Sequence, residues 1–172
     1  MDKTNVTLIG MPGCGKSTVG VLLAKALNLH FTDTDLLIQQ KHGRFLREIL
    51  EADGIDGFIQ KESEVLRALR CEHTCIATGG SAVYSDAAMR HLKEISTVVF
   101  IDLPCAAVEA RVADIRGRGV VIDSGKTLAE LYRERRPLYL RYADITVAAG
   151  GLAIEELLME IATRVIKVKL AG

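Results

Sequence analysis

A short apolar segment, a glycine-rich loop and an amphipathic helix follow one another at the start of this chain, and their order constrains its fold. The apolar residues 6–9 predict a buried strand. The next segment, Gly10-Met11-Pro12-Gly13-Cys14-Gly15-Lys16-Ser17, matches the pattern G-x-x-x-x-G-K-[ST]. Residues 16–28 then carry apolar side chains at helical spacing. A strand that runs through such a loop into a helix is typical of an α/β domain with a parallel sheet.

The composition of this loop suits the binding of nucleotide phosphates. Its glycines let backbone N–H groups approach an anion, and the following helix presents its positive end to the same anion. Lys16 can neutralise the transferred phosphate, and the Ser17 hydroxyl can ligate Mg²⁺. We therefore expect ATP and Mg²⁺ to bind at residues 10–18. Thr18 stands where the dinucleotide-binding fingerprint would need its third glycine, so that reading is disfavoured.

Two other classes of nucleotide-binding protein share this loop. A GTPase is disfavoured because the chain has no N-K-x-D guanine motif. A regulatory ATPase remains an alternative, because the apolar run at 98–102 ends in Asp102, as a Walker-B strand would. Against it, Leu103-Pro104 follows where such an ATPase needs a second catalytic carboxylate.

The rest of the chain alternates between strand-like and helix-like segments. Strands are expected at residues 29–32, 74–77, 97–102 and 145–147, and the segments between them predict helices, including separate ones at 45–52 and 57–70. Such alternation predicts a parallel sheet with helices on both faces. The 172 residues suit one domain, 1–172, with a glycine-rich mobile lid at about 114–125.

Charge and apolar content exclude several broad classes. The formal net charge is zero, which argues against a general nucleic-acid or membrane binder. No apolar run is long enough to span a membrane and no signal peptide is recognised, so we expect a cytoplasmic protein. Cys71, His73 and Cys75 lie close together but lack the fourth ligand of a structural zinc site, so buried reduced thiols are favoured.

Two carboxylates and a glycine pair follow predicted strands. Asp33 and Asp35 are spaced to point to the same side of the chain, at the strand end where ligands bind in parallel sheets. One could hold Mg²⁺ or its waters, and the other could accept the proton of an attacking hydroxyl. The alternative is that Asp35 only caps the helix that follows. Gly79 and Gly80 should reach the same edge and let a ligand approach the backbone, unless they form a simple turn.

Arginines complete the candidate site. Arg116 and Arg118 lie in the glycine-rich segment, where a loop closing over ATP could bring a cation to the phosphate, or where they could simply be solvated. Arg135 lies within the apolar stripe of the helix that begins after Thr127. An inward-facing arginine should have a buried anionic partner, either a protein carboxylate or a substrate.

Taken in order, these motifs resemble the shikimate kinase family over nearly the whole chain. The matching segments are residues 10–17, Asp33-Thr34-Asp35, Asp53-Gly54 before Phe58, Gly79-Gly80, Arg111, Arg118 and Arg135-Arg136-Pro137-Leu138-Tyr139. The resemblance implies a three-layer P-loop kinase fold, whose five-stranded parallel sheet has strand order 2-3-1-4-5. It also implies Mg²⁺-assisted transfer of the γ-phosphate of ATP to the 3-hydroxyl of shikimate by a monomer.

The resemblance further implies roles for individual residues. Ser17 would ligate Mg²⁺ and Asp33 would order its water shell, while Asp35 would bind the substrate hydroxyls and act as base. Gly79, Gly80 and Arg135 would line the substrate pocket. Arg118 would come from the lid and take part in catalysis with Lys16 and Asp35. Arg111 would lie near adenine.

Three departures from the family concern the acceptor side. Ile59 stands where the family has an arginine that holds the shikimate carboxylate, and the loss of such a charged contact costs about 1.5–3 kcal/mol. Arg118 is followed by Gly119-Val120-Val121 instead of Pro-Leu-Leu, and Ser81 replaces a third glycine. Lys61 is a candidate substitute cation. The alternatives to a shikimate kinase are a related enzyme with another small alcohol as acceptor and a nucleotide-binding module without turnover.

Overall fold

The computed structural model describes residues 3–115 and 125–171, and its centre is a five-stranded sheet. The strands are β1 (Asn5–Ile9), β2 (His30–Asp33), β3 (Thr74–Ala77), β4 (Ser96–Asp102) and β5 (Ile145–Ala148). They lie in the order β2-β3-β1-β4-β5, and every neighbouring pair is parallel. The predicted strand order 2-3-1-4-5 is therefore confirmed.

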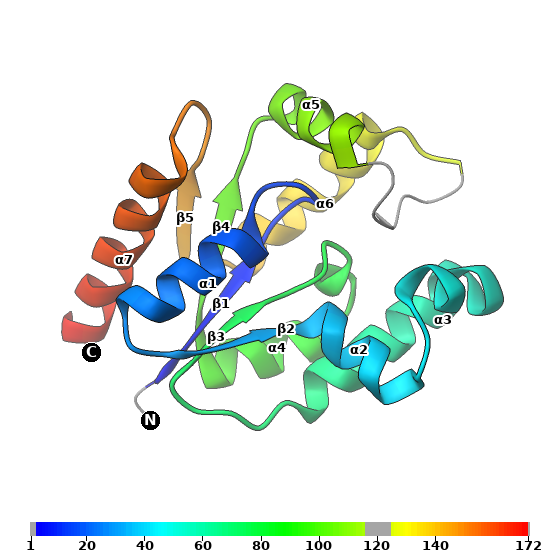
Figure 1. Cartoon of the computed structure of the whole chain (residues 1–172), viewed down its shortest axis with the longest axis horizontal. Helices are drawn as coiled ribbons and strands as arrows, with labels where there is room; N and C mark the ends of the chain where they lie inside the picture. The colour runs from blue at the N-terminus through cyan, green and yellow to red at the C-terminus, as the bar shows by residue number, and fades with distance from the viewer. Residues whose placement is uncertain (1–2, 116–124, 172) are drawn as a thin grey trace.

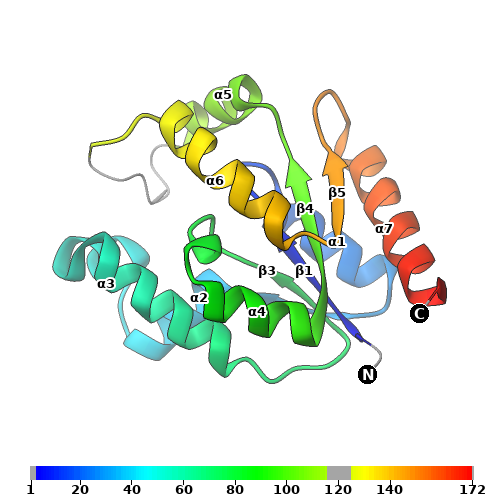
Figure 2. The same ribbon diagram turned by 180° about the vertical axis from the view of Figure 1, so that it is seen from behind.

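Helices cover both faces of this sheet. They are α1 (Lys16–Ala26), α2 (Thr34–His42), α3 (Leu46–Ala68), α4 (Asp86–Ile95), α5 (Cys105–Ile115), α6 (Leu128–Tyr142) and α7 (Ile154–Ala171), with a 3₁₀ turn η1 at Ala82–Tyr84. α1 and α7 lie on one face (Figure 1), and α4 and α6 lie on the other (Figure 2). The predicted three layers are confirmed, and they explain why the central strands β1 and β3 are buried at every position.

The segment between β2 and β3 agrees with the prediction of two helices at 45–52 and 57–70, although both fall within the element labelled α3. α3 runs from Leu46 to Ala68 with a break at Gly54, whose φ of 67° is left-handed. A glycine adopts this non-helical conformation at little cost, so the chain changes direction there and α3 consists of two helical stretches on either side of Gly54. Beyond the break, Phe58 packs with Ile38 and Ile49 in a small apolar cluster of its own. This cluster fixes α2 and α3 beside the end of β2, where the candidate site lies.

The predicted lid at 114–125 falls almost entirely outside the described part of the chain. α5 continues to Ile115, and Arg116 and Arg118 lie outside the described residues. Within residues 3–115 and 125–171, no helix combines the length and the apolar character that crossing a membrane requires.

Candidate active site

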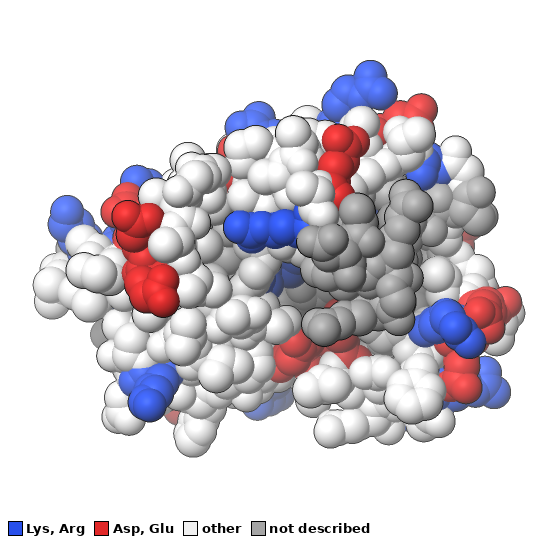
Figure 3. All heavy atoms as spheres, turned by 45° about the horizontal axis from the view of Figure 1, so that its top comes forward, with Lys and Arg blue, Asp and Glu red and all other residues white. Residues whose placement is uncertain are grey.

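A cavity of about 480 Å³ opens at the carboxyl ends of the parallel strands. Figure 3 looks onto this side of the molecule, where basic and acidic side chains both border the central hollow. The cavity is lined by Pro12, Gly13, Gly15, Lys16, Ser17, Thr18, Asp35, Leu46, Phe58, Thr78, Gly79, Gly80, Ser81, Arg111, Arg135 and Ile154. The structure thus brings the predicted phosphate loop, one of the predicted carboxylates, the glycine pair and two predicted arginines to one cavity.

The phosphate loop presents some of its residues to the cavity and uses the others as support. Met11 and Cys14 are fully buried beneath the loop. Gly10 has a φ of 148°, and a Cβ atom there would lie 2.8 Å from the Ile101 carbonyl oxygen. A side chain at position 10 would therefore push the loop away from β4. Of the predicted loop residues, Gly10, Met11 and Cys14 shape the loop and do not line the cavity.

Lys16 is the first residue of α1, and its ammonium group is folded back onto the loop. Nζ donates hydrogen bonds of 2.8 Å to the carbonyl oxygens of both Gly10 and Met11. Only 8% of the residue is exposed. The charge is therefore held at the centre of the loop, next to the backbone N–H groups at the start of α1, where an anion binds favourably.

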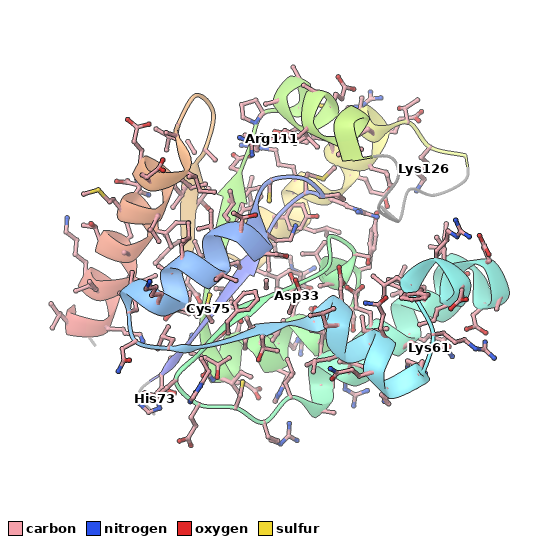
Figure 4. All side chains as sticks on the ribbon, viewed as in Figure 1. Asp33, Lys61, His73, Cys75, Arg111 and Lys126 are labelled. Carbon is pink, nitrogen blue, oxygen red and sulfur yellow. The ribbon has the colours of Figure 1, made fainter. Side chains whose placement is uncertain are left out.

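Ser17 and Asp33 form a pair of oxygen ligands at the edge of this loop. The Ser17 hydroxyl donates a 2.7 Å hydrogen bond to Asp33 Oδ2, and Asp33 lies where β2 passes into α2 (Figure 4). Hydroxyl and carboxylate oxygens beside a phosphate site suit Mg²⁺, which uses one or two protein oxygens together with waters and phosphates. In the described part of the chain, no group of three His, Cys, Asp or Glu residues is placed to hold a metal ion.

Asp33 is also the residue that caps α2. Its Oδ1 accepts a 3.0 Å hydrogen bond from the backbone N–H of Asp35. The helix begins at Thr34, so capping falls to Asp33 and not to Asp35. The Asp35 side chain is thereby left to line the cavity.

The Asp35 carboxylate lies in an environment that disfavours its charge. Burial raises its pKa to about 6, the nearby charge of Asp33 adds to this, and Lys16 opposes it. A carboxylate with this pKa is ionised at neutral pH and is still basic enough to accept a proton from a hydroxyl group.

Glu62 of α3 is a site residue that the sequence analysis missed. It is 1% exposed, and its Oε2 accepts a 2.6 Å hydrogen bond from the Ser81 hydroxyl. Among the described residues, its Oε1 has no hydrogen-bond partner. Its position four residues after Phe58 and three before Val65 places an acid within an apolar stripe, and this signal could have revealed it.

Glycine at position 79 is what allows Glu62 to enter the site. A Cβ atom on Gly79 would overlap Glu62 Oε1 and would lie 3.0 Å from Asp35 Oδ1. Burial raises the pKa of Glu62 to about 7; the Ser81 hydrogen bond opposes this effect and the charge of Asp35 adds to it. Asp35, which lines the cavity, and Glu62, which is buried behind the lining, therefore both lie against Gly79.

Arg135 faces inward, as the apolar stripe of its helix predicts. It is 3% exposed, its Nε donates a 3.0 Å hydrogen bond to the Tyr84 hydroxyl, and its guanidinium lies 5.1 Å from the centre of the Tyr84 ring. Its hydrogen-bond partner is thus a neutral phenol on η1, which sequence spacing did not indicate. The position of the neighbouring backbone is fixed by Tyr139, whose hydroxyl donates a 2.7 Å hydrogen bond to the Gly80 carbonyl.

Of two further predicted residues, Arg111 lines the cavity and Lys61 does not. Arg111 of α5 donates a long 3.5 Å hydrogen bond to the Gly13 carbonyl and lies beside the phosphate loop (Figure 4). Lys61 pairs with Asp53 at 3.6 Å and does not line the cavity. The idea that Lys61 supplies a substitute cation to the acceptor pocket is therefore not supported.

The free energy of unfolding should depend on pH because Glu62 binds a proton in the folded protein. Its ordinary pKa is 4.5 and its folded-state pKa is about 7, so between these pH values the folded protein binds more protons and its stability falls as pH rises. We expect the free energy of unfolding of E62Q, relative to the wild type, to increase from pH 4.5 to pH 7 and to stay constant above. The gain should be on the order of 3 kcal/mol.

Denaturant unfolding of both proteins at a series of pH values measures this difference directly. A matched control is Glu64→Gln, because Glu64 lies on the same helix with an exposed side chain that pairs with Lys41. A difference between E62Q and wild type that does not change with pH would contradict the assignment.

Comparison with known proteins places the chain among small-molecule kinases. The family model described as Shikimate kinase matches residues 12–166. A protein named shikimate kinase from Clostridium botulinum (strain Eklund 17B) is 36% identical over 160 residues, which cover 92% of this chain and 95% of that protein. Another from Synechococcus sp. (strain RCC307) is 41% identical over 155 residues, which cover 88% and 78%.

Solved structures give the same result. A shikimate kinase from Acinetobacter baumannii in complex with shikimate superposes with a TM-score of 0.88 at 31% identity, covering 96% of this chain and 94% of that one. The shikimate kinase from Aquifex aeolicus gives a TM-score of 0.83 at 34% identity, with coverage of 98% and 99%. A gluconokinase from Sinorhizobium meliloti, at 17% identity and a TM-score of 0.64, shares the fold.

Proposed function

Because this chain belongs to the shikimate kinase family of small-molecule phosphotransferases, we propose that it transfers the γ-phosphoryl group of ATP to the 3-hydroxyl of shikimate. The observation that carries the proposal is the shared cavity of about 480 Å³, which has Lys16 and Ser17 on one side and Asp35 with Gly79 on the other. A donor phosphate and an acceptor hydroxyl can therefore meet within one cavity.

On the donor side, the phosphate loop and Lys16 bind and orient ATP. The ammonium group of Lys16 leaves the carbonyl oxygens of Gly10 and Met11 and turns to the transferred phosphate, where it stabilises the negative charge of the transition state. Ser17 and Asp33 would hold Mg²⁺, which when bound neutralises phosphate charge. Arg111 lies at the nucleotide end of the cavity.

On the acceptor side, Asp35 binds the hydroxyl group and accepts its proton on a carboxylate oxygen as the oxygen attacks phosphorus. Its pKa of about 6 still leaves it mostly ionised at neutral pH, and the raised value makes it a stronger base than an ordinary carboxylate. Glu62 and Arg135 define the wall behind Asp35, and Ser81 keeps Glu62 in place. Arg118, which lies outside the described residues, stays a predicted lid cation.

The test is release of ADP from Mg-ATP with a panel of hydroxylated metabolites that includes shikimate and alcohols without a carboxylate. We expect turnover with shikimate and phosphorylation at O3, which NMR of the product identifies. Turnover with another alcohol but none with millimolar shikimate would contradict the proposed acceptor. ATP binding without turnover on any acceptor would favour a nucleotide-binding module. A cytoplasmic location and a monomeric state stay predictions from the sequence.

A further inference from the structure

A second cavity adjoins the acceptor side of the site, and Tyr84 forms part of its wall. This cavity has a volume of about 370 Å³, and it shares Ser81 and Arg135 with the first cavity. Its lining consists of Ile55, Asp56, Ile59, Ser81, Tyr84, Lys126, Leu131, Glu134 and Arg135. Arg135 therefore borders both cavities, whereas Tyr84 borders the second cavity and does not line the first.

Arg135 is held by the protein through one edge of its guanidinium group. Its Nε donates the 3.0 Å hydrogen bond to the Tyr84 hydroxyl, and the guanidinium carbon lies 5.1 Å from the centre of the Tyr84 ring. Among residues 3–115 and 125–171, no second hydrogen bond from Arg135 is found. A Cβ atom on Gly80 would lie 3.1 Å from Nη1 of Arg135, so this terminal nitrogen is next to the glycine pair that lines the first cavity.

The Tyr84 hydroxyl can accept a hydrogen bond from Arg135 because its own proton is directed to another group. Hydrogen bonds from Lys126 first and from Tyr84 second hold the pKa of Glu134 below its usual value, so the Glu134 carboxylate is ionised. A phenol has a single O–H donor, so a hydroxyl that donates to Glu134 presents only lone pairs to Arg135. Burial raises the pKa of Tyr84, so the phenol keeps this proton at neutral pH.

The backbone on either side of Tyr84 is fixed by hydrogen bonds. The Tyr84 N–H donates a 2.9 Å hydrogen bond to the carbonyl of Ser81, directly after the glycine pair. The next residue, Ser85, caps α4, and its hydroxyl lies 2.7 Å from the hydroxyl of Ser63 on α3. The phenol is therefore held against Arg135 by the fold itself, before a ligand binds.

We infer that Tyr84 is a positioning residue for the acceptor: with its proton donated to Glu134, it holds Nε of Arg135 and directs the terminal N–H groups of that guanidinium toward the first cavity. This inference rests on the proposed function, because Tyr84 would set the affinity for the acceptor. Without the hydroxyl, the long arginine side chain would sample more rotamers, and acceptor binding would have to restrict them. Loss of the hydroxyl should therefore weaken acceptor binding and leave the groups at the reacting atoms in place.

Steady-state kinetics of Tyr84→Phe, with shikimate as the varied substrate, test this role. Removal of the hydroxyl should raise KM for shikimate about three- to tenfold, because a hydrogen bond from a charged donor is lost. It should leave kcat and the KM for ATP within about twofold of the wild type. Calorimetric titration with shikimate should give the same factor in Kd. Tyr84 is only half-buried and the ring is kept, so the variant should fold.

Tyr142→Phe is the matched control for a purely structural effect. It removes another hydroxyl that donates to a carboxylate, here Asp86 at 2.7 Å, from a residue that lines neither cavity. Its KM for shikimate should equal that of the wild type.

A double-mutant cycle shows whether Tyr84 acts through Arg135. Arg135→Met alone should raise KM for shikimate, and the addition of Tyr84→Phe should cause no further rise, because the two residues then no longer interact. Glu134→Gln is a second, exposed variant that should also fold. It should raise KM by a smaller factor than Tyr84→Phe, and this effect should disappear when residue 84 is phenylalanine.

The outcomes separate the two proposals. If the wild type does not phosphorylate shikimate, the proposed function fails and the role of Tyr84 fails with it. If the wild type phosphorylates shikimate but Tyr84→Phe has an unchanged KM, the role of Tyr84 alone is wrong. The same conclusion follows if Tyr84→Phe raises KM by an equal factor with and without Arg135, or if Tyr142→Phe gives the same rise.

Discussion

Asp35→Asn should lose nearly all phosphoryl transfer while it still binds ATP. We expect kcat to fall by about 10²–10⁴-fold, the usual contribution of a positioned general base. The substitution keeps the shape of the side chain, and the backbone N–H of residue 35 can still donate to Asp33, so α2 keeps its cap. It also removes a carboxylate whose pKa is raised by burial, so the variant should be at least as stable as the wild type at pH 8.

Single-turnover phosphorylation measures the chemical step, and titration with nucleotide measures ATP binding. Asp53→Asn is the matched control: it makes the same chemical change at a residue that pairs with Lys61 and lines neither cavity. Turnover of Asp35→Asn within about tenfold of wild type would remove Asp35 as the base and would leave it a role in binding alone.

The order of elements along the chain made much of the fold predictable. Alternating strands and helices, with a phosphate loop after the first strand, are compatible with few sheet topologies, and short-range patterns define each element. The two helices predicted at 45–52 and 57–70 correspond to the two parts of α3. The φ of 67° at Gly54 interrupts the helix between them, and helical periodicity alone cannot show the conformation of that one glycine.

Site residues were predictable where a motif or a stripe marked them. Lys16, Ser17 and Asp33 follow from spacing, and Arg135 follows from a charge within an apolar face. Glu62 carries the same kind of signal and was missed, because nothing nearby in sequence suggested the Ser81 hydroxyl that holds it.

Contacts between distant segments could not be predicted. Lys61 is close in sequence to Ile59, yet it turns to Asp53, whereas Lys126 shares a cavity with Ile59 although the two are far apart along the chain. The direction of a long, flexible side chain depends on its partners in the folded protein, and sequence spacing alone does not contain that information.

Lys16→Met should combine a large catalytic loss with a measurable loss of stability. Lys16 is the cation that we propose contacts the transferred phosphate, and removal of one preorganised electrostatic contact of this kind costs about 10²–10³-fold in kcat. The same substitution leaves the carbonyl oxygens of Gly10 and Met11 without their 2.8 Å hydrogen bonds. The Met11 carbonyl keeps its 3.2 Å hydrogen bond from the Cys14 N–H, whereas the loss of the Lys16 hydrogen bond at the buried Gly10 carbonyl should cost about 1–3 kcal/mol of unfolding free energy.

The two effects can be measured separately and have different controls. Thermal unfolding without nucleotide measures the stability lost with the hydrogen bonds of the phosphate loop. Single-turnover kinetics at saturating Mg-ATP measure the loss of charge stabilisation at the transferred phosphate. Lys25→Met changes a lysine in the last turn of the same helix, where the side chain is exposed, and should affect neither. If Lys16→Met unfolds at a lower temperature but keeps turnover within tenfold of wild type, then Lys16 only supports the loop, and another cation must stabilise the transferred phosphate.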